Sequence, residues 1–255
     1  MDPVLEALKK ELEIEAGRDQ VPIIRGPERS LLLSAAEKAS PKRILEIGTA
    51  IGYSALLLAE RFPLAEIDTL EIDPARHARA EEVMRAAGFS QRVHCHLGDA
   101  AELLETLEGP YDFLYLDGPK GQYLRQLKAI EQKLSPHAVI AADNVLFRGM
   151  VESDAPVPHR YRTLVVRLRE YIAYVKTHYA TVIYKDGDGL AVSYQLEIRN
   201  EKWWQRHTIH KVAQIEMEGC HGAGECCSFE KQVLCGLHHS IGTIFASEPK
   251  ALFYY

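Results

Sequence analysis

Apolar and polar residues follow two different spacings along the first 195 residues of the chain. Short apolar runs predict buried strands at residues 43–48, 66–72, 92–97, 111–117 and 138–143. Between these runs, helices are predicted at residues 53–61 and 123–133, and Asp73-Pro74 and Gly88 mark the start and the end of another helix. Strands that alternate with helices in this way predict an α/β domain built on a mostly parallel sheet.

The two ends of this region add further elements. Apolar positions at helical spacing predict helices over residues 4–16, 28–39 and 162–176. Two short apolar runs on either side of Asp186-Gly187-Asp188-Gly189 predict a closing hairpin over residues 180–184 and 190–194. The pattern therefore predicts one domain over residues 1–195, with helices in its first 40 residues that cap the sheet.

Residues 196–255 differ from this domain in composition. Only Cys95 lies before residue 196, and four of the five cysteines follow it. Soft ligands for zinc or an iron–sulfur cluster gather there, namely Cys220, His221, Cys226, Cys227, Cys235, His238 and His239. Their spacing matches no paired Cys-x-x-Cys signature, so an extension without a catalytic role is the alternative interpretation.

Composition and charge limit the function classes. The 255 residues carry 30 Lys and Arg against 36 Asp and Glu, a net charge of −6, so any nucleic-acid contact must come from a local basic patch. The chain contains no long apolar segment that could span a bilayer, and its N-terminus lacks an apolar signal core. We expect a cytoplasmic protein without a membrane partner.

The segment Glu46-Ile-Gly48-Thr-Ala-Ile-Gly52 follows the first predicted strand and opens a helix. Its glycines allow close approach of a ligand, and Glu71, at the end of the next strand, is placed to bind a ribose hydroxyl pair. A dinucleotide site would have the spacing Gly-x-Gly-x-x-Gly, and the acidic residue at position 46 would repel a pyrophosphate. A ligand with cationic sulfonium and ammonium groups fits better. A plain strand–turn–helix corner is the structural alternative.

Oxygen-bearing side chains follow two later strands. Asp117 ends one strand, and Asp143 and Asn144 end another, so the carboxyl ends of parallel strands would bring them together. Such a set suits Mg²⁺ or a similar divalent ion. Lys120 follows Asp117 by three residues, and a lysine beside a bound cation favours the neutral form that a general base requires. A helix-start lysine in solvent and ordinary strand-end caps are the structural alternatives.

These motifs resemble the metal-dependent O-methyltransferases that include catechol and caffeoyl-coenzyme A methyltransferases. The resemblance covers residues 21–195 and is carried by LEIGTAIGYS, Glu71, GDA at 98–100, LDGPKGQY and ADNVLFRG. VPI at 21–23, KGQY at 120–123, DNVLF followed by a basic residue and glycine, and GDGLA at 187–191 are similar to bacterial tRNA 5-hydroxyuridine methyltransferases.

The resemblance implies a Rossmann-like, seven-stranded sheet with one reversed strand and helices on both faces. It implies S-adenosylmethionine as cofactor, with the residues Ile24, Glu46, Gly48, Ser54, Glu71, Asp99, Ala100 and Asp117 around it. It also implies Asp117, Asp143 and Asn144 as metal ligands, Lys120 as the base, and a homodimer.

A tRNA substrate also requires phosphate contacts. Basic residues gather on or before the helix at 162–176 and beside the metal residues, and the candidates for RNA binding are Arg148, Arg160, Arg162, Arg167 and Arg169. A solvated helix face would carry similar residues. The leading hypothesis is methylation of 5-hydroxyuridine at the tRNA wobble position to 5-methoxyuridine. A small-molecule catechol or caffeoyl-coenzyme A methyltransferase is the enzyme alternative, and a cofactor-binding protein that recruits a partner is the non-enzyme alternative.

Overall fold

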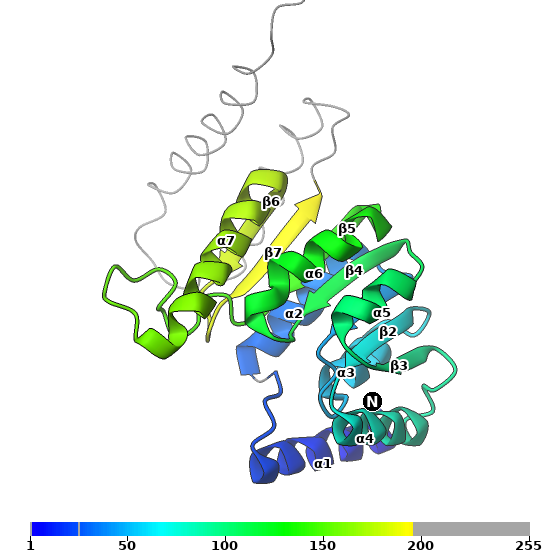
Figure 1. Ribbon diagram of the computed structural model, residues 1–255. Helices are drawn as coiled ribbons and strands as arrows, with labels where there is room; N and C mark the ends of the chain where they lie inside the picture. Colours follow the sequence, from blue (N-terminus) through cyan, green and yellow to red (C-terminus); the bar gives the residue numbers. More distant parts are fainter. Residues whose placement is uncertain (1, 25, 196–255) are drawn as a thin grey trace, which may run out of the picture. The chain divides into compact units, whose positions relative to one another are not determined.

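The structure of the chain, a computed structural model, describes residues 2–24 and 26–195 (Figure 1). The strands are β1 Arg43–Ile47, β2 Glu66–Glu71, β3 Val93–Leu97, β4 Tyr111–Leu116, β5 Leu134–Ala142, β6 Tyr179–Tyr184 and β7 Leu190–Gln195. The α-helices are α1 Pro3–Asp19, α2 Gly26–Ala39, α3 Tyr53–Arg61, α4 Pro74–Ala86, α5 Ala100–Thr106, α6 Tyr123–Ile130 and α7 Arg162–His178. Short 3₁₀ turns lie at Lys120–Gln122, Glu131–Lys133 and His159–Tyr161. The metal-ligand hypothesis for the cysteines and histidines of 196–255 lies outside the described residues.

The strands form one sheet of seven, in the order β3-β2-β1-β4-β5-β7-β6. Neighbouring strands from β3 to β5 run parallel, and β7 runs antiparallel to both β5 and β6. The predicted sheet with one reversed strand is therefore confirmed. The chain order changes direction between β1 and β4, and ligands of open α/β sheets bind at such a switch point, beyond the carboxyl ends of the strands.

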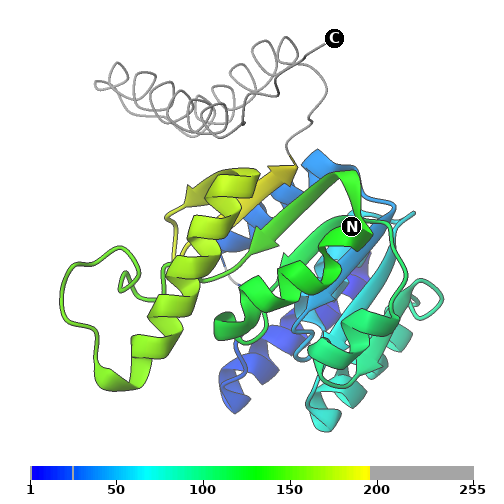
Figure 2. The ribbon, with the colours of Figure 1, turned by 45° about the horizontal axis from the view of Figure 1, so that its top comes forward.

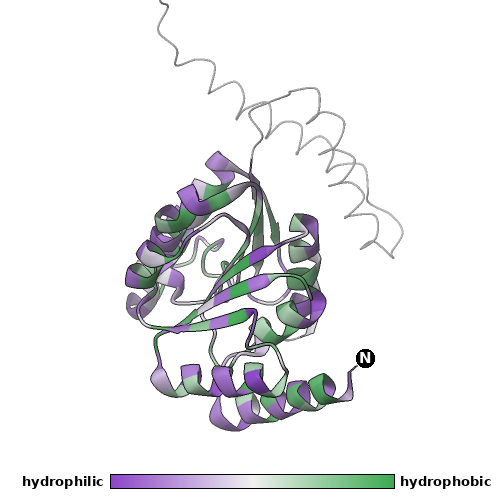
Figure 3. Ribbon diagram, turned by 90° about the vertical axis from the view of Figure 1, so that its right-hand side faces the viewer, coloured by the Kyte–Doolittle hydropathy of each residue, from purple (hydrophilic) through white to green (hydrophobic). Residues whose placement is uncertain are grey.

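Helices cover both faces of the sheet, as Figures 1 and 2 show. Alternate residues of each strand point to opposite faces. Ile44 and Phe113 join a core with α1 to α4, whereas Leu45 and Leu114 join a second core with α5 to α7. Hydrophilic residues mark the outer surfaces of the helices (Figure 3), and no helix within residues 2–24 and 26–195 is long and apolar enough to cross a membrane.

Several elements differ from those that the sequence predicts, and the following differences are examples. β5 begins at Leu134 rather than at residue 138. Leu134 already pairs with Tyr111 of β4, and the register between the two strands shifts before Val139 pairs with Phe113. A short helix, α5, follows Asp99 where the pattern predicts only a turn. α7 runs two residues beyond residue 176. These short or terminal segments carry too few apolar positions for periodicity to define them.

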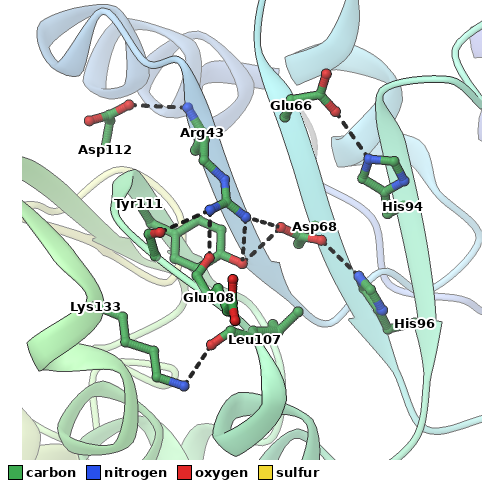
Figure 4. Close-up of polar contacts among 11 residues, drawn as sticks. Arg43, Glu66, Asp68, His94, His96, Leu107, Glu108, Tyr111, Asp112 and Lys133 are labelled. Carbon is green, nitrogen blue, oxygen red and sulfur yellow. Dashed lines mark hydrogen bonds and ion pairs between the residues drawn. The ribbon is translucent and has the colours of Figure 1, made fainter.

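A polar network joins β1, β2, β3 and β4 on the face covered by α5 to α7 (Figure 4). The buried Asp68 carboxylate lies 2.8 Å from His96 Nε2, accepts a 2.8 Å hydrogen bond from the Tyr111 hydroxyl and pairs with Arg43 at 3.2 Å. Burial alone would raise the pKa of Asp68, but these partners hold it below its usual value. The network stabilises the sheet below the switch point.

Candidate active site

Two glycine-dependent turns at the switch point between β1 and β4 form the floor of the candidate site. Gly48 follows β1 with a φ of +106°, and a Cβ there would lie 2.6 Å from the Asp117 carbonyl oxygen. Gly52 precedes α3 with a φ of +87°, and its Cβ would lie 3.2 Å from the Cα of Ala80 in α4. Residues that carry a side chain rarely adopt either backbone conformation, so glycine is required at both positions.

Glu46 is a fully buried acid directly beneath this floor. Its Oε2 accepts a 2.5 Å hydrogen bond from the Thr69 hydroxyl, which lies 2.6 Å from the Thr49 hydroxyl. Burial raises the pKa of Glu46 to about 7, against the opposing effect of the Ser54 and Thr69 hydroxyls, and the charge of Glu71 raises it further. Its Oε1 is buried and has no hydrogen-bond partner of good geometry among the described residues. This orphaned oxygen fits a cationic ligand group.

Glu71 ends β2 and is held rigidly by backbone donors. Its Oε2 accepts from the Ala50 amide at 2.8 Å, and its Oε1 accepts from the amides of Ile72 and Asp73 at 2.9 Å. A carboxylate can accept about four hydrogen bonds, so capacity remains for a ribose hydroxyl. The position is consistent with the predicted ribose contact, which stays a prediction.

The remaining predicted cofactor residues lie on either side of this floor. Ser54 is buried in the first turn of α3, and Ile24 is buried in the segment between α1 and α2. Asp99 accepts a 2.8 Å hydrogen bond from the Ala101 amide, so it caps α5, and Ala100 is the first residue of that helix. Their roles toward a cofactor stay predictions.

Sequence patterns did not indicate two exposed apolar side chains beside Glu71. Ile72 is 63% exposed, and Leu97, at the end of the neighbouring β3, is 47% exposed. Large apolar groups at adjacent strand ends offer a surface for a flat ring. The sequence signal that could have indicated Ile72 was an apolar residue directly after the acid that ends a predicted strand.

The predicted metal ligands meet at the ends of β4 and β5. Leu116 pairs with Ala142, so Asp117 and Asp143 follow neighbouring strand positions. Asp143 is 4% exposed, and its Oδ1 accepts a 2.7 Å hydrogen bond from the Asn144 amide. Asn144 adopts a φ of +53°, which is uncommon for a residue with a side chain and places strain beside the carboxylates.

Electrostatic effects connect these carboxylates with Lys120. Burial, and then the Asp143 charge, raise the pKa of Asp117 well above its usual value, whereas Lys120 lowers it. Burial raises the pKa of Asp143 to about 6; the Asn144 amide and Lys120 oppose this effect, and the charges of Glu28 and Asp188 add to it. The structure thus brings Asp117, Lys120 and Asp143 together.

These residues fit a divalent cation. Two crowded carboxylates with raised pKa values are the groups whose ionised forms a bound cation would stabilise. Within the described residues, no three His, Cys, Asp or Glu side chains converge as a metal site. A third protein oxygen would therefore come from the Asn144 amide, and water and substrate would complete the coordination.

A strained loop follows Asn144. Phe147 and Arg148 have φ values of +42° and +57°, and Asp188 accepts a 3.0 Å hydrogen bond from the Arg148 amide. The Phe147 ring packs edge-on against Tyr161, with 5.2 Å between centroids. The Arg148 and Arg160 guanidinium groups lie 5.8 and 4.5 Å from the centroids of Phe147 and Tyr161. Two aromatic rings and two cations thus gather just after the predicted metal ligands in the chain.

The other candidate RNA-binding arginines contact the backbone. Arg169 donates to the carbonyls of three loop residues, Met150, Val151 and Ser153. Arg162 donates to the Val157 carbonyl, and Arg167 donates to the Gly121 carbonyl at 3.3 Å. All five arginines are exposed, but these three guanidinium groups hold the loop and the Lys120 turn, whereas Arg148 and Arg160 make ring contacts.

Comparison with known proteins identifies the family. A family model described as O-methyltransferase matches residues 4–196. The catechol O-methyltransferase of Niastella koreensis is 30% identical over 187 residues, which cover 70% of this chain and 84% of that protein. The catechol O-methyltransferase of Mycobacterium tuberculosis is 33% identical over 167 residues, covering 64% and 74%. Several other curated relatives match about half of this chain and 45–58% of their own length.

Solved structures agree with this assignment. The S-adenosylhomocysteine-bound methyltransferase PaMTH1 of Podospora anserina is 28% identical with a TM-score of 0.65, and the match covers 77% of this chain and 89% of that one. The cofactor-bound protein Rv0187 from MTB is 25% identical with a TM-score of 0.64, covering 76% and 90%. The chain therefore belongs to the O-methyltransferase family, in the S-adenosylmethionine-dependent group that includes the catechol and caffeoyl-coenzyme A enzymes.

Proposed function

We propose that this chain transfers the methyl group of S-adenosylmethionine to the 5-hydroxyl of 5-hydroxyuridine at the tRNA wobble position. The observation that carries the methyl-transfer proposal is the grouping of Asp117, Lys120 and Asp143 at the ends of β4 and β5, next to the cofactor floor at Gly48. This grouping supports the proposal, because a methyl donor bound on that floor would end beside two carboxylates and a basic side chain.

The residues on the cofactor side of the site would hold the methyl donor in place by charge and by hydrogen bonds. The orphaned Oε1 of Glu46 would pair with the ammonium group of the donor, and Glu71 would accept from its ribose. A donor held at both ends presents its methyl group in one direction, and such positioning supplies much of the acceleration in a displacement reaction.

The residues on the substrate side of the site would remove the proton of the substrate hydroxyl. Asp117, Asp143 and Asn144 would hold a divalent cation, which supplies Lewis acidity and orients two neighbouring substrate oxygens. The Lys120 amine would take the proton of the hydroxyl, and the oxygen lone pair would then form a bond to the methyl carbon. The carbon–sulfur bond breaks with its electrons to sulfur, so the products are the methyl ether and S-adenosylhomocysteine.

The cluster of Phe147, Arg148, Arg160 and Tyr161 favours an RNA substrate. Aromatic rings and guanidinium planes bind unstacked bases, and exposed arginines pair with phosphates. Within the part of the chain that the structure describes, both guanidinium groups contact rings and donate no side-chain hydrogen bond, which leaves donors for a phosphate. A tRNA anticodon loop offers both unstacked bases and phosphates.

A small-molecule catechol methyltransferase is the second candidate. Two relatives of this chain carry the name catechol O-methyltransferase, and a catechol also presents two neighbouring oxygens. The two substrates differ in their need for the arginines, since a catechol has no phosphate.

The test uses undermethylated tRNA, Mg²⁺, S-adenosylmethionine and the full chain, with nucleosides identified by mass spectrometry. We expect 5-methoxyuridine to form from 5-hydroxyuridine. Methylation of free catechols without any methylated nucleoside would overturn the tRNA assignment and favour the second candidate.

A charge-reversal series separates the RNA surface from the cofactor site. We expect Arg148→Glu combined with Arg160→Glu to lower kcat/KM for tRNA by about tenfold or more, because two phosphate attractions become repulsions. The affinity for S-adenosylhomocysteine should stay within about twofold. Arg125→Glu, on the exposed side of α6, is the control and should change neither value. Equal loss of tRNA activity in the control would contradict the assignment.

A further inference from the structure

Gln126 occupies a position where the helix pattern calls for an apolar residue. The buried face of α6 consists of Tyr123, Gln126, Leu127 and Ile130, spaced three and four residues apart. Gln126 is only 3% exposed, and its Oε1 is buried without a hydrogen-bond partner in the described part of the chain. Buried amides are normally paired, so a polar group at a core position without a partner requires an explanation.

The amide lies beneath the switch point. A Cβ on Gly118 would lie 3.8 Å from Gln126 Nε2, 3.4 Å from Cγ2 of Ile47 and 3.5 Å from the Ile47 carbonyl. Ile47 ends β1 and Gly118 follows Asp117 after β4, so Gln126 reaches the ends of both strands. Because residue 118 is a glycine, no side chain of that residue stands between the amide and the loop that follows Asp117.

The face of the sheet on which Gln126 lies indicates which part of the cofactor would be nearest to its amide. Gln126 is on the buried face of α6, which packs beside α5, and α5 begins at Ala100 with Asp99 as its cap, the two residues expected to border the adenine. Glu46 and Ser54, expected at the amino-acid end, belong to the opposite side with α3. Gln126 is therefore on the base side of the candidate site.

We propose that the Gln126 carboxamide recognises the 6-amino group of the cofactor's adenine. A glutamine amide offers an acceptor and a donor side by side, which complements the amino group and adjacent ring nitrogen of adenine. Its Oε1 accepts from the amino group, and this contact satisfies the oxygen that has no partner among residues 2–24 and 26–195. The inference rests on the proposed use of S-adenosylmethionine, but it is independent of the choice between tRNA and catechol.

The experiment is a chemical double-mutant cycle on binding alone. Calorimetry measures the affinity of S-adenosylhomocysteine and of its analogue with an unsubstituted purine, which lacks the amino group. The proteins are the wild type, Gln126→Met, Gln126→Glu and the packing control Leu127→Met at the next buried position. No methyl acceptor is present, so a failed tRNA assignment cannot affect the result.

We expect the wild type and Leu127→Met to bind the adenine compound about tenfold more tightly than the purine compound, equivalent to 1.4 kcal/mol. Gln126→Met should reduce this preference to within about twofold, and Gln126→Glu, which keeps an acceptor, should retain it. Equal affinity of the wild type for both ligands would overturn the proposal whether or not any variant folds. An unchanged preference in Gln126→Met would overturn it as well. Failure of the wild type to bind either compound would instead refute the proposed cofactor.

Discussion

The buried Glu46 carboxyl should make the stability of the ligand-free protein depend on pH. The pKa of Glu46 rises from 4.5 to about 7 on folding, mainly because the carboxyl is buried. The folded protein therefore holds this proton more tightly than the unfolded chain, and stability falls as pH rises between these two values. The difference corresponds to about 3 kcal/mol once the pH is above 7.

Glu46→Gln removes the charge and keeps the shape. Relative to the wild type, the variant should gain about 1 kcal/mol in unfolding free energy at pH 5 and about 3 kcal/mol at pH 8. The same change should weaken binding of S-adenosylhomocysteine by about tenfold or more, because the ammonium group loses its buried partner. Stability would thus rise while affinity falls.

The assay is urea unfolding of the ligand-free protein in a metal chelator, at several pH values from 5 to 8. Glu105→Gln, which changes an exposed carboxyl on α5, is the control and should show no pH-dependent gain. A stability gain in Glu46→Gln that is the same at pH 5 and pH 8 would refute the reasoning, because it would mean that the Glu46 proton is not coupled to folding.

Three further predictions concern the floor, the sheet network and the metal. Gly48→Ala should lower the unfolding free energy by more than about 2 kcal/mol, since its Cβ would meet the Asp117 carbonyl; Gly88→Ala, which also has a positive φ but open space around it, should cost less in the same urea titration. Asp68→Asn should cost about 1–3 kcal/mol near neutral pH. Because the pKa of Asp68 is lowered, that cost should shrink as the pH falls below its usual value, and a cost unchanged in acid would contradict the pairing. Chelation should stop methyl transfer and Mg²⁺ should restore it, whereas full activity in chelator would exclude the proposed metal.

The main elements of the sheet could be predicted from local sequence because their signals are local. The apolar run before Gly48 and the helical spacing across residues 162–176 each indicate one element without reference to distant residues. The seven-stranded sheet with one reversed strand followed from the resemblance to known enzymes and is confirmed, whereas the order of the strands came only from the structure. The short helix α5 was missed because seven residues do not establish a period.

The strand-end acids were predictable for a similar reason. Parallel strands bring their carboxyl ends to one edge, so Asp117 and Asp143 had to be neighbours once both were assigned to strand ends. Periodicity did not indicate which of the exposed arginines bind the protein's own backbone. Arg169 and Arg160 are both exposed and basic, but only the structure shows that Arg169 donates to loop carbonyls while Arg160 lies over a ring.

The sequence by itself determined the elements, the glycine turn, the acids at the strand ends and, through its motifs, the family. Tertiary structure decided everything that depends on contact between distant segments. Gly48 must lack a side chain because Asp117, far along the chain, passes beside it. Burial, which no local pattern measures, raises the pKa of Glu46 and leaves the Gln126 oxygen without a partner among the residues that the structure describes. The proton affinity of Glu46 and the unpaired state of the Gln126 oxygen therefore depend on packing and not on residue type alone.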